Sequence, residues 1–191
     1  MTTQSSIADK LWTPQQGTMG LLRQIALVLV GTAVIALSAR IQVPMWPVPM
    51  TLQTLAVLLI ALSFGARLAA ATLVAYLLQG AVGMPVFAGG GGIAFLISPT
   101  AGYLFGFLAA AVIVGILADR DWHRSALGTL AAVGVGTILI YTLGVGWLAV
   151  HVGLTQAISL GLIPFVAGDL VKIAIAVMIL PQVWSLVEKV R

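Results

Sequence analysis

Long apolar runs constrain the fold of this chain more than any other feature. Stretches of this kind are typical of helices that cross a lipid bilayer, whose hydrocarbon core is about 30 Å thick. Because the runs are continuously apolar, without alternating polar residues, a β-barrel is a poor alternative. The sequence contains six such runs, at Leu21–Ala39, Met50–Phe64, Leu68–Val82, Ala101–Ala118, Ala126–Val150 and Leu160–Val183.

The composition agrees with a membrane protein, since 61% of the residues are hydrophobic, 7% are charged and the mean hydropathy is +1.14. The 191 residues leave room for the spans and short connections only. We therefore expect an all-α polytopic membrane protein, with a single transmembrane domain over residues 1–191 built as a six-helix bundle. The polar residues 1–19 predict a short exposed tail and no removable signal peptide.

The second and third runs are close enough to be mistaken for one helix. A single helix from Met50 to Val82 would be roughly 50 Å long at 1.5 Å per residue, which exceeds the bilayer core. The segment Ser63–Arg67 therefore predicts a tight turn between two helices.

The basic residues predict the orientation. The formal net charge of +4 would suggest nucleic acid as the partner of a soluble chain, but here these residues stand singly at the ends of spans. Cytoplasmic connections hold the excess of Lys and Arg, so both termini are predicted to be cytoplasmic in the cell (inner) membrane. On that face the sequence places Lys10, Arg23, Arg67, Arg120, Arg124, Lys189 and Arg191, and on the outer face only Arg40.

Two connections on the outer face have unusual compositions, rich in proline or in glycine. The first, Arg40–Gln53, contains three prolines and is named here the proline strap, because prolines favour a stiff extended segment. The second, Gly83–Thr100, is named the glycine-rich loop and could cover a ligand. No Lys-Ser/Thr pair follows its glycines, which excludes a phosphate-binding loop of the Walker type. Ser98 or Thr100 is expected to cap the following helix.

A carboxylate and an ammonium group lie inside the last apolar run. Asp169 and Lys172 are three residues apart, so a helix places them on one face. Ionisable groups inside a membrane are costly and commonly mark a functional site. A mutually neutralising structural pair is the alternative interpretation. A small ligand with polar groups on an apolar body would suit a site of this kind.

Catalytic patterns are missing from the sequence. His123 and His151 fall on opposite membrane faces, where both are expected to be solvated, and they cannot share a metal ion. The chain contains no cysteine, no His-Glu-x-x-His and no Gly-x-Ser-x-Gly motif. We expect no enzymatic activity, no metal and no cofactor.

Four segments together resemble the BioY family, the biotin-specific substrate-binding subunits, or S components, of energy-coupling factor (ECF) vitamin transporters. The segments are distributed over most of the chain, from the first span to the last, and follow one another in the order found in the family. They are Val48–Val57 with Pro44 before it, Gly80–Gly90, Ser98–Phe107 and Phe165–Lys172.

The resemblance implies a six-helix S component that binds biotin as its transported ligand from the outer side. By motif it implies contacts with the ligand from residues of the strap, the glycine-rich loop and two helices. These residues are Thr51, Gln53, Phe87, Gly89, Gly90, Tyr103, Asp169 and Lys172.

The resemblance also implies partners, namely a transmembrane coupling subunit and two ATPases, although some family members work without the full complex. S components often contact the coupling subunit through Ala-x-x-x-Ala in the first helix, where this chain has Thr32-x-x-x-Ala36. Two alternatives remain open at this point. One is an S component for another vitamin such as thiamin or riboflavin, and the other is a structural membrane protein with a neutralised ion pair.

Overall fold

Helices make up nearly all of the computed structural model, which describes residues 17–189 and, at the C-terminal end, side chains up to residue 182. Most of the predicted polar tail lies outside the described residues. The elements are α2 (Thr18–Arg40), β1 (Gln42–Val43), β2 (Met50–Thr51), α3 (Gln53–Ala81), η1 (Ile93–Ile97), α4 (Ala101–Ala118), η2 (Trp122–Arg124), α5 (Ala126–Val152), α6 (Leu154–Gly161) and α7 (Ile163–Lys189).

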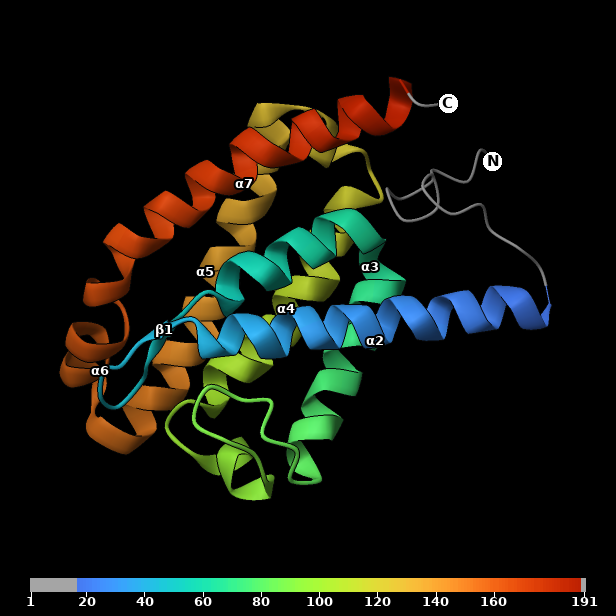
Figure 1. The fold of residues 1–191 in the computed structure, drawn as a ribbon. Helices are drawn as coiled ribbons and strands as arrows, with labels where there is room; N and C mark the ends of the chain where they lie inside the picture. Colours follow the sequence, from blue (N-terminus) through green and yellow to red (C-terminus); the bar gives the residue numbers. More distant parts are fainter. Residues whose placement is uncertain (1–16, 190–191) are drawn as a thin grey trace.

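Five of the described helices, α2, α3, α4, α5 and α7, are long and apolar enough to cross a membrane. The sequence predicted six spans, and the difference lies in α3, which contains the predicted second and third spans. The backbone of Gly65 is not helical, with φ 74° and ψ 174°, and Figure 1 shows that α3 changes direction sharply there. This break falls inside the predicted turn at Ser63–Arg67.

The break in α3 is held by the end of α4. The backbone N–H of Ala66 donates a hydrogen bond of 3.1 Å to Oδ2 of Asp119. A side chain at Gly65 would collide with this carboxylate, since an added Cβ would lie 2.1 Å from Oδ1. Glycine suits the position because its φ is positive and because it leaves room for Asp119.

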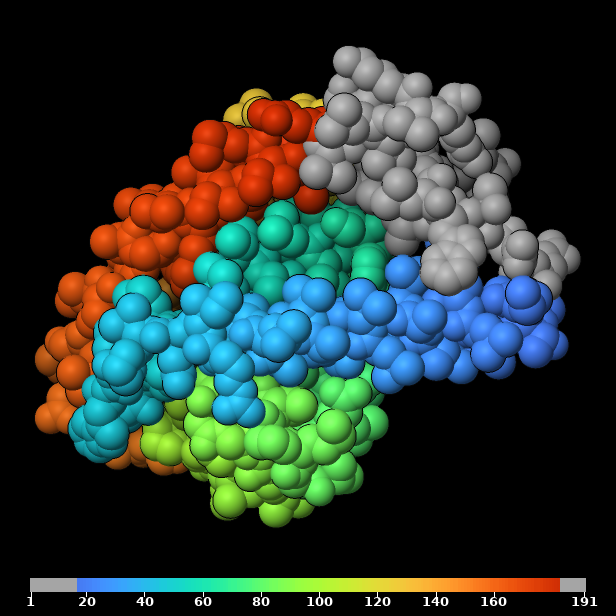
Figure 2. Space-filling model, viewed as in Figure 1, coloured from blue at the N-terminus to red at the C-terminus, as the bar shows by residue number. Residues whose placement is uncertain are grey.

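The proline strap is not the single stiff, extended segment that its prolines predicted. It folds back as a hairpin, in which Gln42 pairs with Thr51 and Val43 with Met50. Backbone hydrogen bonding between β1 and β2 outweighs the stiffness of the intervening prolines. Met50 then reaches α7, where an added Cβ at Gly168 would lie 2.8 Å from its Sδ. Figure 2 shows the strap at the end of α2, next to α7.

The connections gather at two ends of the bundle. The strap, the glycine-rich loop and α6 lie together at the lower left of Figure 1, and η2 lies at the opposite end. The residues between the last two apolar runs do not form an irregular connection, since Leu154–Gly161 form α6. Thr100 occupies the N-cap position of α4 as predicted, yet its side chain makes no capping hydrogen bond, and Ser98 donates to the carbonyl of Phe95.

His123 contradicts the expectation of a solvated side chain, because it is only 1% exposed. It lies in η2, which contacts α4, α5 and α7. Burial lowers the pKa of this imidazole below its usual value, since the charged form is poorly solvated there. His151, in contrast, is exposed as expected.

Candidate ligand-binding site

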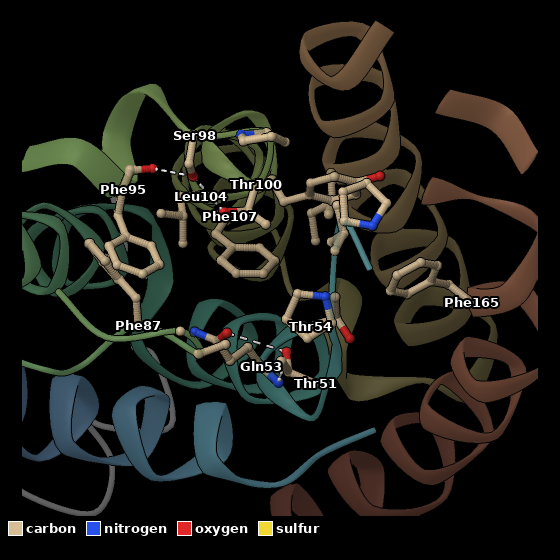
Figure 3. Close-up of a pocket in the computed structure, with 18 of the residues that line it drawn as sticks. Thr51, Gln53, Thr54, Phe87, Phe95, Ser98, Thr100, Leu104, Phe107 and Phe165 are labelled. Carbon is tan, nitrogen blue, oxygen red and sulfur yellow. Dashed lines mark hydrogen bonds between the residues drawn. The ribbon is translucent and has the colours of Figure 1, made fainter. Parts of the chain in front are cut away.

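A cavity of about 250 Å³ lies where the proline strap, the glycine-rich loop and four helices meet. This volume is close to the lower end of the range for small-molecule sites. Figure 3 shows Phe87 and Phe95 at one side of the cavity, Phe165 at the other and Phe107 between them. The helices contribute Gln53 and Thr54 (α3), Tyr103, Leu104 and Phe107 (α4), Ile140 and Tyr141 (α5), and Phe165 and Lys172 (α7).

Aromatic side chains form most of the cavity wall. Four of the six phenylalanines and two of the three tyrosines of the chain line it. Tyr103, Tyr141 and Phe165 contact one another, with ring centroids 6.3 to 6.5 Å apart. Aromatic residues make up only 7% of the chain, and the fold brings together at this site rings that come from different helices.

Two glycines fix the position of Tyr103. Its ring lies against Gly144, where an added Cβ would be 2.4 Å from the ring carbons. Its hydroxyl donates a hydrogen bond of 2.7 Å to the carbonyl oxygen of Gly161, at the end of α6. The tyrosine thus connects α4 with α5 and α6 while its ring faces the cavity.

The polar end of the cavity is built around the ion pair predicted from the sequence. Lys172 Nζ lies 2.7 Å from Asp169 Oδ1 and donates a second hydrogen bond, of 3.0 Å, to the hydroxyl of Thr54. The hydroxyl of Tyr141 donates to the other carboxylate oxygen of Asp169. The side chains of Lys172 and Asp169 are 12% and 8% exposed, so the ion pair is largely shielded from solvent.

A chain of hydrogen bonds joins the strap to the glycine-rich loop behind the cavity. The amide of Gln53 donates to the hydroxyl of Tyr76 at 2.7 Å, and Tyr76 donates to the carbonyl of Val86 at 3.0 Å. Thr51 in turn donates to the amide oxygen of Gln53 at 3.3 Å. Outside this chain, the Arg40 guanidinium donates to the carbonyl of Pro85. These bonds hold both connections over the same opening.

Phe87 depends on close contacts with two glycines. Its ring lies against Gly80 of α3, where an added Cβ would be 1.9 Å from the ring. Its backbone exchanges two hydrogen bonds with Gly90, of 2.9 and 3.1 Å. Gly90, with φ 135°, supports the loop in this way and does not line the cavity, whereas Gly89 does.

Six of the eight predicted ligand contacts line the cavity, and the structure separates the other two from it. The six are Thr51, Gln53, Phe87, Gly89, Tyr103 and Lys172. Gly90 lies behind Phe87. Asp169 lines a much smaller cavity on the other side of Lys172, together with Thr137.

The residues predicted to contact a coupling subunit face the inside of the chain. Thr32 is 3% exposed, donates to the carbonyl of Leu29 and accepts a 3.3 Å hydrogen bond from Gln79 of α3. Ala36 is partly buried against the core. Contact with a partner through these two residues stays a prediction, and it would require α2 to move away from α3.

Several lining residues were not predicted from the sequence, above all Thr54, Tyr141 and Phe165. One signal was available for Tyr141, since a hydroxyl in the middle of a long apolar run needs a hydrogen-bond partner there. Phe165 gave no such signal, because a phenylalanine in a membrane helix is as often in contact with lipid as with a cavity.

The sequence of this chain matches a known protein family over nearly its whole length. The sequence model of the BioY family matches residues 4–189. The chain belongs to the BioY family. Membership confirms the resemblance found in the sequence, and with it the prediction that the chain is a transport protein of the membrane and not an enzyme.

Individual BioY relatives are similar in sequence to this chain over most of their length. The chain is 41% identical to "Biotin transporter BioY" of Thermotoga maritima, over 83% of this chain and 94% of that protein. It is 38% identical to "Probable biotin transporter BioY" of Pyrococcus horikoshii, over 82% of this chain and 93% of that protein. The fold is similar to a crystal structure of the S component for biotin from an ECF-type ABC transporter, with a TM-score of 0.76 and 22% identity over 90% of this chain and 95% of that one.

Proposed function

We propose that this chain is the substrate-binding membrane subunit of a biotin uptake transporter. One observation carries the proposal: in a member of the BioY family, an aromatic cavity ends on the ammonium of Lys172 and the hydroxyls of Thr54 and Tyr141. Biotin combines an apolar thioether ring with a ureido group that both donates and accepts hydrogen bonds. Such a ligand matches apolar walls with a few polar groups at one end.

The six-span topology is part of this proposal. The two parts of α3 on either side of Gly65, about 18 and 24 Å long, would form the second and third spans, and because both are shorter than the bilayer core, flanking residues would complete each crossing. Both termini would then lie at the cytoplasmic face of the cell membrane, in line with the positions of the basic residues. The strap and the glycine-rich loop would face outward, so that biotin enters from the outside. All spans form one transmembrane domain.

Energy for uptake would come from partner subunits. The structural relative is described as part of an ECF-type ABC transporter. By analogy we propose a transmembrane coupling subunit and two ATPases as partners of this chain, which itself carries no nucleotide-binding motif. The chain would supply ligand recognition and no covalent chemistry.

A second ligand class follows from the aromatic wall. Six aromatic side chains around one cavity could also stack on a flat heterocycle such as thiamin or riboflavin. The relatives named as biotin transporters favour biotin, and competition between the vitamins decides between the ligands.

Ligand binding by purified protein tests the proposal. The wild-type protein in detergent should bind biotin in isothermal titration, and an excess of thiamin or riboflavin should not displace it. Lys172→Ala should weaken binding at least tenfold, or about 1.4 kcal/mol. Arg120→Ala, at an exposed site far from the cavity, is the matched control and should bind like the wild type. Displacement by another vitamin, or equal binding by both variants, would contradict the proposal.

A further inference from the structure

Four polar side chains from three helices meet at the inner end of the cavity. Thr54 of α3, Tyr141 of α5 and Lys172 of α7 line the cavity. Asp169 of α7 lies behind them, against the smaller cavity. The carboxylate is therefore separated from the ligand space by the groups to which it is bonded.

Asp169 binds one of these groups with each of its oxygens. Oδ1 accepts from the Lys172 ammonium at 2.7 Å, and Oδ2 accepts from the Tyr141 hydroxyl. Two helices, α5 and α7, are joined by this carboxylate. Since a hydroxyl has a single proton, Tyr141 is the donor in its bond with the carboxylate, and only its oxygen remains to accept a bond from elsewhere.

The ring of Tyr141 is held independently of its hydroxyl. It makes edge contacts with Tyr103 and Phe165, each with centroids 6.3 Å apart. Removal of the hydroxyl alone should leave these aromatic contacts in place. The consequence would fall on Asp169, whose Oδ2 would lose its donor in a buried environment.

We propose that Tyr141 is a positioning residue of the biotin site. By holding Asp169 Oδ2, it fixes the carboxylate so that Oδ1 keeps the Lys172 ammonium at the cavity wall, next to Thr54. Without this hydroxyl the carboxylate can rotate toward the smaller cavity and draw Lys172 away from the ligand. The inference rests on the proposed function and adds to it a residue that acts on the ligand through Asp169.

A double-mutant cycle tests this role. Tyr141→Phe should weaken biotin binding about tenfold in the wild-type background. In the Asp169→Ala background the same substitution should have almost no effect, because the side-chain acceptor through which Tyr141 acts is already gone. Titration up to millimolar biotin keeps the weakened variants measurable, and a thermal unfolding curve of each ligand-free variant shows whether it is folded.

Tyr103→Phe provides the matched comparison. It also removes a buried hydroxyl from the same aromatic cluster, but that hydroxyl bonds to Gly161 and not to Asp169. Any effect of Tyr103→Phe on affinity should therefore be the same in the wild-type and Asp169→Ala backgrounds.

The outcomes separate the inference from the proposed function. The positioning role is overturned if the Tyr141→Phe variant binds biotin as tightly as the wild type. It is also overturned if the substitution weakens binding equally in both backgrounds. In either case the proposed function as a biotin-binding subunit stands. Equal weakening would instead assign Tyr141 a direct ligand contact. A wild-type protein that binds no biotin overturns the proposed function and this inference with it.

Discussion

At the scale of single residues, the pair of Asp169 and Lys172 combines two roles that can be separated. Lys172→Met leaves the carboxylate buried without its partner charge, which typically costs about 3–5 kcal/mol. We expect this variant to have a clearly lower thermal midpoint. The double variant with Lys172→Met and Asp169→Asn carries neither charge, so most of the loss in thermal midpoint should be reversed. This double variant should still bind biotin at least tenfold more weakly than the wild type. Recovery of binding as well would show that the pair is only structural.

Gly80 is a second position at which one side chain decides the shape of the cavity. Gly80→Ala would push the Phe87 ring away, since the added Cβ has no room beside it. We expect weaker biotin binding, by about tenfold, in isothermal titration. Gly134→Ala is the matched control, because nothing lies within 4 Å of a Cβ added there. Similar affinities for the two variants would argue against a role of Gly80 in shaping the site.

At the scale of elements, the break in α3 determines how the first three helices are arranged. Asp119 caps the second part of α3 by accepting from Ala66, and loss of such a cap typically costs about 1 kcal/mol. Asp119→Ala should lower the thermal midpoint by roughly 2–4 °C. Arg120→Ala, the exposed neighbour, should leave the midpoint almost unchanged. If the two variants unfold at the same temperature, the contact is not a cap in solution.

The short helix η2 should make stability depend on pH through His123. Burial lowers the pKa of this side chain in the folded protein, while the unfolded chain takes up the proton near pH 6.5. The unfolded state therefore binds more protons below about pH 6.5, and stability should fall as the pH decreases from there. His123→Gln should make the thermal midpoint less sensitive to acidification. An equally steep decrease in the variant would assign the effect to groups other than His123.

At the scale of the whole molecule, the number of crossings can be measured directly, because the chain has no cysteine that would react with a labelling reagent. With six crossings, single cysteines in place of Trp46 and His151 should react with an impermeant maleimide from outside, and one in place of Trp122 only from the cytoplasmic side. If α3 crossed once, Trp46 and Trp122 would share a face and His151 would lie on the other. Labelling of intact cells therefore distinguishes the two topologies.

The class of the molecule, its long helices and the position of the break in α3 could all be predicted from the sequence alone. These are local properties, since about 20 apolar neighbours suffice to favour a membrane span, and a spacing of three residues suffices to pair Asp169 with Lys172. The family also followed from short motifs, and so did six of the twenty residues that line the cavity.

The set of side chains that share the cavity follows from the packing of the helices and could not be predicted from the sequence. Tyr141 and Phe165 belong to different apolar runs, and nothing in either run indicates that their rings meet Tyr103. The hairpin of the strap, the burial of His123 and the position of Asp169 behind Lys172 likewise depend on contacts between distant segments. The physical reason is that hydrophobicity drives helices into a membrane without specifying how they pack, which is set by glycine contacts, aromatic fit and buried hydrogen bonds.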